Sequence, residues 1–119
     1  MTGSRSRRKG AAHERLVAEW LRGLWPDAAR GLGQTRSGSE VADVDGDDVP
    51  VWVEVKVGKR PNPRAAMDQA EEATDGRPVL VVVRDNGAGA RAPRDFICMR
   101  VDDFVGLIER ERGYGDDPA

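Results

Sequence analysis

Glu54, Val55 and Lys56 place a carboxylate and an ammonium group two residues apart within an alternating apolar stretch. Residues 51–57 read VWVEVKV, and valine at every second position predicts a β-strand. On a strand, residues two apart point to the same face, about 6.5 Å from each other. We therefore expect the valines to face a core, and Trp52, Glu54 and Lys56 to face the other way.

Asp43 supplies a second carboxylate close to Glu54. Residues 41–45 (VADVD) predict a short strand that runs into a turn at 46–48 and pairs with residues 51–57 as a hairpin. Opposed side chains in such a pair lie about 5 Å apart, and two carboxylates at that distance repel unless a cation lies between them. Carboxylate oxygens with water in the remaining positions suit Mg²⁺, for which Mn²⁺ can substitute. The pattern predicts a divalent-metal site.

The same acidic stretch also has the spacing of a calcium-binding loop. Four acids fall at the ligand positions of an EF-hand loop, namely Asp43, Asp45, Asp47 and Glu54. Asp48 stands where that loop requires glycine, and a valine-rich strand follows in place of a helix. We therefore reject the EF-hand interpretation.

Two predicted helices carry further polar residues that could reach this site. Residues 9–24 have apolar residues at helical spacing, and Glu14 lies at the edge of that apolar stripe, so it either reaches the metal or stays on the surface. The helix predicted over residues 62–74 has a stripe of small alanines with Gln69 along it. An inward glutamine needs a hydrogen-bond partner, so Gln69 is either presented to the site or partly exposed.

Charge is distributed unevenly, although the net charge is only -2. The first 36 residues are basic, residues 37–49 hold only acids among their charged residues, and residues 50–66 are basic again. Basic surface beside an acidic patch suits a protein that binds phosphates around a divalent cation, although a mixed solvated surface explains the charge equally well. The predicted DNA contacts are Arg5, Arg7, Arg8, Lys9, Lys59 and Arg60.

Length and element order predict one domain. The 119 residues suffice for a single core. We expect a mobile basic arm over 1–8, a single folded domain over 9–112 and an acidic flexible tail over 113–119. Further elements are predicted as strands at 30–35, 79–83 (buried) and 96–99 (edge) and a last helix at 102–109. The resulting order, αβββαββα, indicates an α/β fold with a mixed β-sheet flanked by helices.

Composition narrows the remaining choices. No apolar run approaches the length of a membrane-spanning helix, and the lone Cys98, predicted to lie in the core, leaves no intrachain disulfide. A reducing cytoplasm, or a host cytoplasm for a phage protein, is the expected compartment. We interpret His13 as a helix-surface histidine rather than a general base. Trp20 and Trp25 are predicted to lie in the core or an interface, and Trp52 either walls the site, stacks on DNA or does neither.

Taken together, these motifs resemble the PD-(D/E)xK nuclease superfamily, and within it the archaeal and phage type of Holliday junction resolvase. The similarity covers residues 9–83, about two thirds of the chain. The matching pieces, in order, are Lys9-Gly10 with Glu14, Ser37-Gly38, Asp43, Glu54-Val55-Lys56, Gln69-Ala70 and the apolar strand 79–83.

The resemblance implies a restriction-endonuclease-like fold and a Mg²⁺-dependent active site. Asp43 and Glu54 would bind metal with help from Glu14, Lys56 would position or activate the attacking water, and Gln69 would orient the site. Ala42 stands where the family usually has proline, so Asp45 remains an alternative ligand, although we favour Asp43.

The implied activity is structure-selective cleavage of four-way DNA junctions by phosphodiester hydrolysis in a homodimer. A general, repair or restriction-like nuclease of the same superfamily is the first alternative. A non-catalytic DNA-binding module with the same fold is the second.

Overall fold

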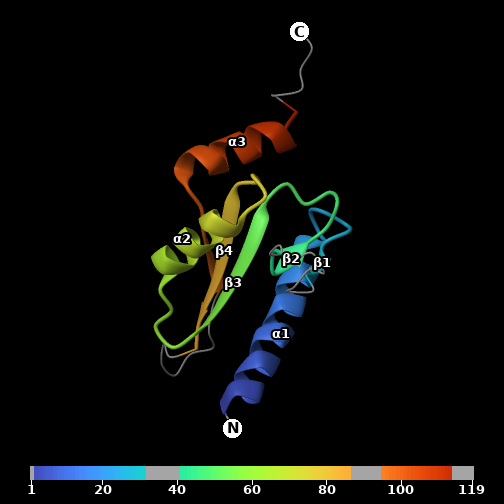
Figure 1. Cartoon of the computed structure of the whole chain (residues 1–119). Coiled ribbons are helices and arrows are strands. Elements are labelled where there is room, and N and C mark those ends of the chain that lie inside the picture. The colour runs from blue at the N-terminus through green and yellow to red at the C-terminus, as the bar shows by residue number, and fades with distance from the viewer. Residues whose placement is uncertain (1, 32–40, 87–94, 114–119) are drawn as a thin grey trace.

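The computed structural model describes residues 2–31, 41–86 and 95–113, with side chains from Gly10 onward. It is a small α/β domain with a five-stranded mixed sheet flanked by helices, as predicted (Figure 1). The element order is also the predicted one. The elements are α1 (Thr2–Leu21), β1 (Ala29–Arg30), β2 (Val44–Asp45), β3 (Trp52–Gly58), α2 (Pro63–Ala73), β4 (Val79–Asp85), β5 (Asp95–Cys98) and α3 (Val101–Glu111).

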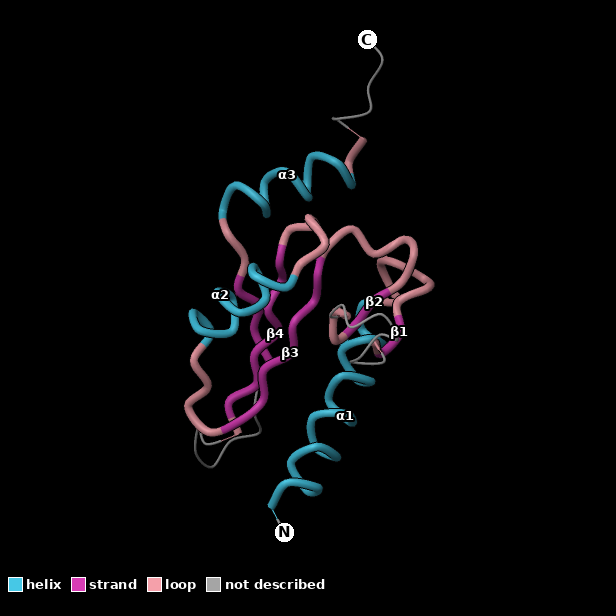
Figure 2. The backbone as a smooth tube through the Cα atoms, viewed as in Figure 1, coloured by secondary structure: helices cyan, strands magenta, loops and turns pink. Residues whose placement is uncertain are grey.

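The sheet has the strand order β1-β2-β3-β4-β5, so β1 and β5 form its edges. β3 and β4 are parallel and lie side by side through the middle of the domain (Figure 2), and α2 connects them. All other neighbouring strands are antiparallel. The predicted hairpin of β2 and β3 is confirmed, with Val44 opposite Val53.

A helix covers each face of the sheet. On one face, Val17 of α1 belongs to the same buried cluster as Val53 of β3 and Val51, which directly precedes β3. On the other face, Ala70 of α2 clusters with Trp52. Successive residues of β3 therefore point to opposite helices, as strand geometry requires. β4 begins with a run of five buried apolar residues because both of its faces are covered.

Helix α1 begins at Thr2, earlier than the predicted start at Lys9. The basic segment 1–8 therefore continues the helix from residue 2 and does not precede it as a separate arm. Residues 2–8 contain three arginines, which are good helix formers. The segment has no proline, so no helix-breaking residue stops the helix before Thr2. The contact of this segment with DNA remains a prediction.

The other boundaries shift by a few residues. The strand predicted at 30–35 is present as β1 at Ala29–Arg30, and residues 32–35 lie outside the described part, as do the Ser37-Gly38 loop and residues 114–119 of the predicted tail. α2 begins at Pro63 because Asn62 caps it: the Asn62 side chain accepts a hydrogen bond of 3.0 Å from the N–H of Ala65.

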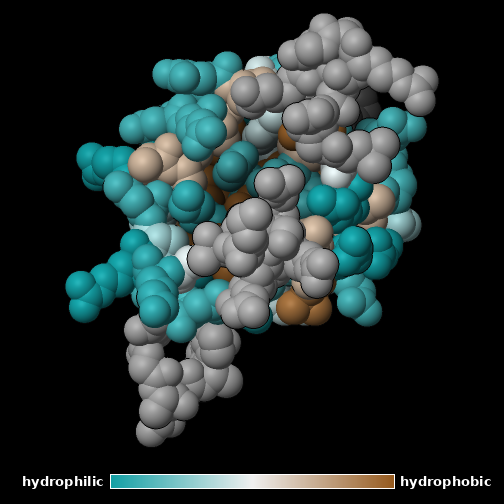
Figure 3. Space-filling view, turned by 60° about the horizontal axis from the view of Figure 1, so that its bottom comes forward, coloured by the Kyte–Doolittle hydropathy of each residue, from teal (hydrophilic) through white to brown (hydrophobic). Residues whose placement is uncertain are grey.

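Several large apolar side chains remain exposed. Trp20 on α1 is 49% exposed and Phe104 on α3 is 47% exposed, whereas Trp25 is buried. Cys98, predicted to be a core residue, is only half-buried at the end of β5. On the face shown in Figure 3, hydrophilic residues prevail among the described ones, and a few hydrophobic residues are visible between them and at the rim. No helix in the described part is long and apolar enough to cross a membrane.

Candidate functional site

Asp43 lies just before β2 and reaches across the hairpin to β3. Its backbone N–H donates a hydrogen bond of 2.9 Å to the carbonyl of Val53. Its side-chain Oδ2 accepts one of 2.8 Å from the N–H of Val55. Val44 is opposite Val53, and Asp43, which also bonds to Val53, is held beside Val53 and Val55, the two residues that flank Glu54. The direct opposition of Asp43 and Glu54 across the hairpin stays a prediction.

The segment after β1 holds Asp43 in this position. The N–H of Gly31 donates a hydrogen bond of 2.8 Å to the carbonyl of Asp43. A Cβ added at Gly31 would lie 1.9 Å from the backbone oxygen of Ala42, so any other residue would push the two segments apart. Gly31 was not predicted as part of the site, because a single glycine before a loop is an unspecific sequence signal.

The electrostatic surroundings of Asp43 disfavour its ionised form. Burial is the largest cause and raises the pKa of Asp43 from 3.8 to about 6. The hydrogen bond from Val55 lowers that pKa, the negative charge of Glu14 raises it, and the positive charge of Arg30 lowers it. A carboxylate that is costly to ionise and lies near a second acid would be stabilised by a cation.

Glu14 approaches Asp43 from helix α1. Its Oε1 accepts a hydrogen bond of 2.8 Å from Nε of Arg30, the last residue of β1. Arg30 is opposite Val44, the residue that follows Asp43, so Glu14 is held near Asp43. The structure thus brings together Glu14 and Asp43, which are far apart in the sequence.

Glu54 and Lys56 lie on the face of β3 that carries Trp52, the face covered by α2. Glu54 is half-buried and Lys56 is exposed. Lys56 lines a hollow of about 380 Å³ together with Lys59 and Gly10, which places an α1 residue beside the end of β3.

The number of acids at the candidate centre bears on which metal the site can hold. Glu54 is on the α2 side of the sheet while Glu14 is on α1, which covers the other face. Among residues 2–31, 41–86 and 95–113, no three metal-ligating side chains converge. Asp43 and Glu54 alone still suit Mg²⁺, which keeps several waters and uses one or two carboxylates.

Gln69 is not on the inward face of α2. The buried residues of this helix are Ala66, Met67 and Ala70, whereas Gln69 is exposed. Of the two interpretations of Gln69, the exposed position is the one observed, and its place on the inward face of the helix is not. The large apolar side chain of Met67 turns the buried face away from Gln69, because burying Met67 removes more apolar surface from water.

Trp52 is a core residue. It is 3% exposed, which excludes stacking on DNA in this conformation. Arg77 lies over its ring, with the guanidinium carbon 5.7 Å from the ring centroid. The indole N–H of Trp52 has no hydrogen-bond partner among the described residues.

Asp45 is engaged elsewhere. Its Oδ1 accepts a hydrogen bond of 2.8 Å from Nη1 of Arg77 and one of 2.9 Å from the N–H of Gly46. Arg77 donates further hydrogen bonds of 2.9 to 3.4 Å to the carboxylate of Asp75 and to the carbonyls of Val49 and Val51. Asp45 thus joins the turn after β2 to the α2–β4 connection, which leaves Asp43 as the better candidate ligand.

The predicted DNA-binding residues fall in two places. Arg5, Arg7, Arg8 and Lys9 lie on α1, and their side chains are outside the described part. Lys59 and Arg60 are exposed in the turn after β3. The turn is a defined one: Arg60 has a positive φ of 47°, and its N–H donates a hydrogen bond of 3.1 Å to Asp85.

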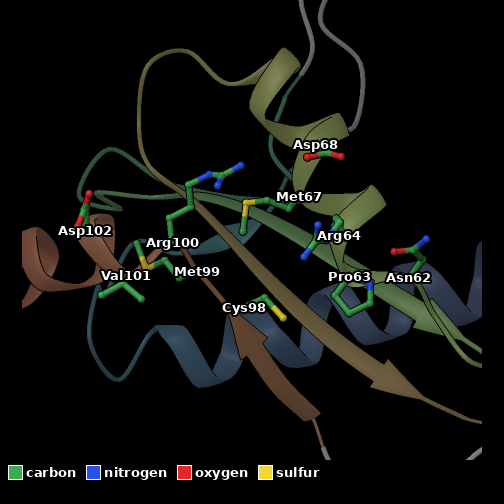
Figure 4. Close-up of a pocket in the computed structure, with 10 residues that line it drawn as sticks. All are labelled: Asn62, Pro63, Arg64, Met67, Asp68, Cys98, Met99, Arg100, Val101 and Asp102. Carbon is green, nitrogen blue, oxygen red and sulfur yellow. The ribbon is translucent and has the colours of Figure 1, made fainter.

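A second hollow lies away from the candidate site. It measures about 820 Å³ and lies between the start of α2, the end of β5 and the start of α3 (Figure 4). Its lining includes Met67 and Met99, with Arg64 and Arg100 among the polar residues around them. None of the predicted site residues lines this hollow.

His13 is buried, contrary to the prediction of a surface histidine. It is 5% exposed, and its Nε2 lies 2.5 Å from Oδ2 of Asp95 at the start of β5. No sequence signal pointed to this contact, because the two residues are 82 positions apart.

No family model matches the chain, and no curated protein or solved structure matches it.

Proposed function

We propose that the chain is a Mg²⁺-dependent endodeoxyribonuclease of the PD-(D/E)xK type, with its centre at Asp43 and Glu54. One observation carries the proposal: Asp43 bonds to Val53 and Val55, the residues on either side of Glu54, and burial, with a smaller contribution from Glu14, raises the pKa of Asp43 to about 6. A protein gains no stability from placing acids in this way. The arrangement is useful where a divalent cation is bound.

Each residue of the centre has a distinct role in this proposal. Asp43 and Glu54 would hold the metal, and Glu14 would assist from α1. When bound, Mg²⁺ supplies Lewis-acid stabilisation of charge on the scissile phosphate. Lys56 projects from the same face of β3 as Glu54, so its ammonium group would position the attacking water and offset negative charge that develops on the phosphate. An exposed Lys56 is accessible to a nucleic-acid backbone.

Gln69 has the weakest support among the proposed site residues. It is exposed on α2, so it would act only at the periphery of the site. The exposed basic residues Lys59 and Arg60 follow β3 directly and would contact backbone phosphates next to the cleaved one.

A four-way DNA junction is the proposed substrate, and a homodimer the proposed active form. The support is the resemblance of residues 9–83 to junction resolvases, together with the near two-fold symmetry of a junction, which a C₂ dimer matches. Linear duplex is the substrate in the alternative of a general, repair or restriction-like nuclease.

A cleavage assay tests the proposal. The wild-type protein is incubated with a four-way junction and with linear duplex containing the same sequences, with Mg²⁺ and with EDTA. We expect cleavage only with Mg²⁺, and faster cleavage of the junction. Equal cleavage of both substrates would support the general nuclease and exclude junction selectivity.

Matched variants assign any activity to the proposed centre. Glu54→Gln removes one carboxylate of the centre, and Glu72→Gln removes an exposed carboxylate on α2 by the same chemical change. Loss of cleavage in the first and retention in the second is the expected result. Binding to DNA without cleavage under any metal condition would refute the nuclease proposal and favour the non-catalytic DNA-binding module.

A further inference from the structure

A hydrogen-bonded network of polar side chains, with its centre buried, connects α1 to the sheet at the β5 edge. His13 Nε2 donates a hydrogen bond of 2.5 Å to Oδ2 of Asp95, and the other oxygen of Asp95 accepts one of 2.8 Å from Nε of Arg84. The Asp95 side chain is 9% exposed and His13 is 5% exposed. Arg84 lies on β4, so three elements meet at one carboxylate. The ring of Trp20 adds an edge-to-face contact with His13 at 6.1 Å between centroids.

A gain in stability alone does not explain why His13, Asp95 and Arg84 are linked in this way. Taking charged groups out of water costs free energy, so a buried ion pair contributes little net stability compared with apolar side chains of the same volume. Such a pair is, however, directional. The apolar contacts of α1 around it, such as those of Val17 and Ala18, are not directional and would allow the helix to rotate or slide.

Residues 13 and 14 tie α1 to both edges of the sheet. His13 bonds to Asp95 on β5, and the next residue, Glu14, bonds to Arg30 on β1. β5 and β1 are the two edge strands. Consecutive helix residues point about 100° apart around the helix axis, so holding His13 on one side determines where Glu14 points on the other.

We propose that His13, held by Asp95 and Arg84, is a positioning residue that orients α1 so that Glu14 lies beside Asp43. The proposal rests on the function proposed above, in which Glu14 assists metal binding. It assigns His13 no contact with metal or DNA. The Glu14–Arg30 hydrogen bond then depends on a contact at the opposite edge of the sheet.

Two substitutions at His13 separate orientation from simple packing. His13→Leu removes the hydrogen bond but leaves Asp95 paired with Arg84, so the buried carboxylate keeps a partner. His13→Gln places an amide N–H at about the position of Nε2 and can restore the contact with Asp95. We expect His13→Leu to weaken Mn²⁺ binding, measured by calorimetry, by roughly 10-fold to 100-fold, as for loss of a residue that supports a ligand. His13→Gln should bind Mn²⁺ within about threefold of wild type if such a partial rescue follows the same rule.

A core substitution controls for lost stability. Val17 lies one turn further along α1 than His13. Val17→Ala removes buried apolar contacts and leaves His13, Asp95 and Arg84 unchanged. It should lower the unfolding midpoint while Mn²⁺ affinity stays near the wild-type value. Equal loss of affinity in Val17→Ala and His13→Leu would overturn the positioning role.

A double-mutant cycle tests whether His13 acts through Glu14. In the Glu14→Gln background, His13→Leu should cause no further loss of Mn²⁺ affinity or of cleavage rate, because the group that it orients is already absent. Losses that add in the double variant would show that His13 acts by another route and would overturn the proposal.

A crystal structure of metal-free His13→Leu separates failure of this inference from failure of the nuclease proposal. We expect Glu14 to have left its position 2.8 Å from Arg30. If that hydrogen bond persists, the positioning role is refuted, whatever the protein does to DNA. If the bond is lost but the wild type binds no Mn²⁺, His13 orients Glu14 and only the proposed function fails. Should His13→Leu not fold, Asp95→Asn, which keeps the side-chain volume, replaces it with the same expectations.

Discussion

The side chain of Asp43 accepts a hydrogen bond of 2.8 Å from the backbone N–H of Val55, the residue that follows Glu54 on β3. This bond fixes the direction of the Asp43 carboxylate before any cation binds. It also leaves the carboxylate with other lone pairs for a metal or water.

Removing either acid of the centre should abolish cleavage and leave DNA binding largely intact. Asp43→Asn and Glu54→Gln each delete a metal ligand but no cation that contacts phosphate, so a rate loss on the order of 10²-fold or more is expected. Single-turnover cleavage and a binding titration measure the two effects. Asp47→Asn, an exposed acid of the same stretch, is the control. An inactive Asp45→Asn with an active Asp43→Asn would show that Asp45 is the ligand.

Asp43 should make the metal-free protein less stable as pH rises. Its pKa is about 6 in the folded protein and 3.8 ordinarily. Below pH 4 the carboxyl is protonated in both states and costs nothing. Between about pH 4 and 6, Asp43 ionises in the unfolded chain but stays largely protonated in the folded protein. The free energy of unfolding therefore falls as pH rises from the unfolded pKa to the folded pKa, by about 2–3 kcal/mol in total.

Denaturant unfolding in EDTA measures this effect. Asp43→Asn keeps an acceptor for Val55 but cannot ionise, so its advantage over wild type should grow from pH 4 to 7. Mg²⁺ should then stabilise the wild type and not the variant. A pH-independent difference between the two proteins would contradict the buried-carboxylate explanation.

Lys56→Ala should be inactive and still bind metal. The lysine ammonium has no lone pair to offer a cation, but its charge offsets the negative charge that develops on the phosphate. Calorimetric titration with Mn²⁺ should give wild-type affinity for Lys56→Ala and loss of binding for Glu54→Gln. If Lys56→Ala loses metal binding together with activity, the role of Lys56 is structural.

Neutralising the basic start of α1 should weaken DNA binding and reduce its salt dependence. Replacing Arg5, Arg7 and Arg8 by Gln keeps the helix length and removes three candidate phosphate contacts. Each contact contributes roughly 0.9 to the log–log salt slope on duplex DNA. Turnover at saturating DNA should survive, because the centre is untouched. Unchanged affinity and slope would show that this segment does not contact DNA.

Light scattering should give about twice the chain mass of 13.0 kDa at micromolar concentration. Of the two tryptophans predicted to lie in the core or an interface, Trp25 is buried within the domain and is excluded as an interface residue, as is the buried strand 79–83. Trp20 and Phe104 remain available because each is about half exposed. Phe104→Ser and Trp20→Ser are made separately, and the variant that becomes monomeric identifies the surface that forms the dimer interface. A monomeric wild type without preference for junctions would favour the general nuclease.

The amino-acid sequence by itself determined the hairpin and the acids placed on it. The valine alternation of β3 and the short distance along the chain from Asp43 to Glu54 are local signals. A strand has a period of two, so pattern alone assigns its faces. The order of helices and strands was also predictable, because it follows from apolar periodicity within each segment.

Only the tertiary structure decided which side chains the helices bring to the sheet. The alanine stripe of α2 is compatible with more than one rotation, and burial of Met67 turned Gln69 to the surface. The parallel pairing of β3 and β4 lets α2 cover Trp52. His13 and Asp95 meet across 82 residues, and such a contact depends on how a helix packs over the whole sheet. Local periodicity carries no information about that packing, because it records which face is apolar and not what that face will meet.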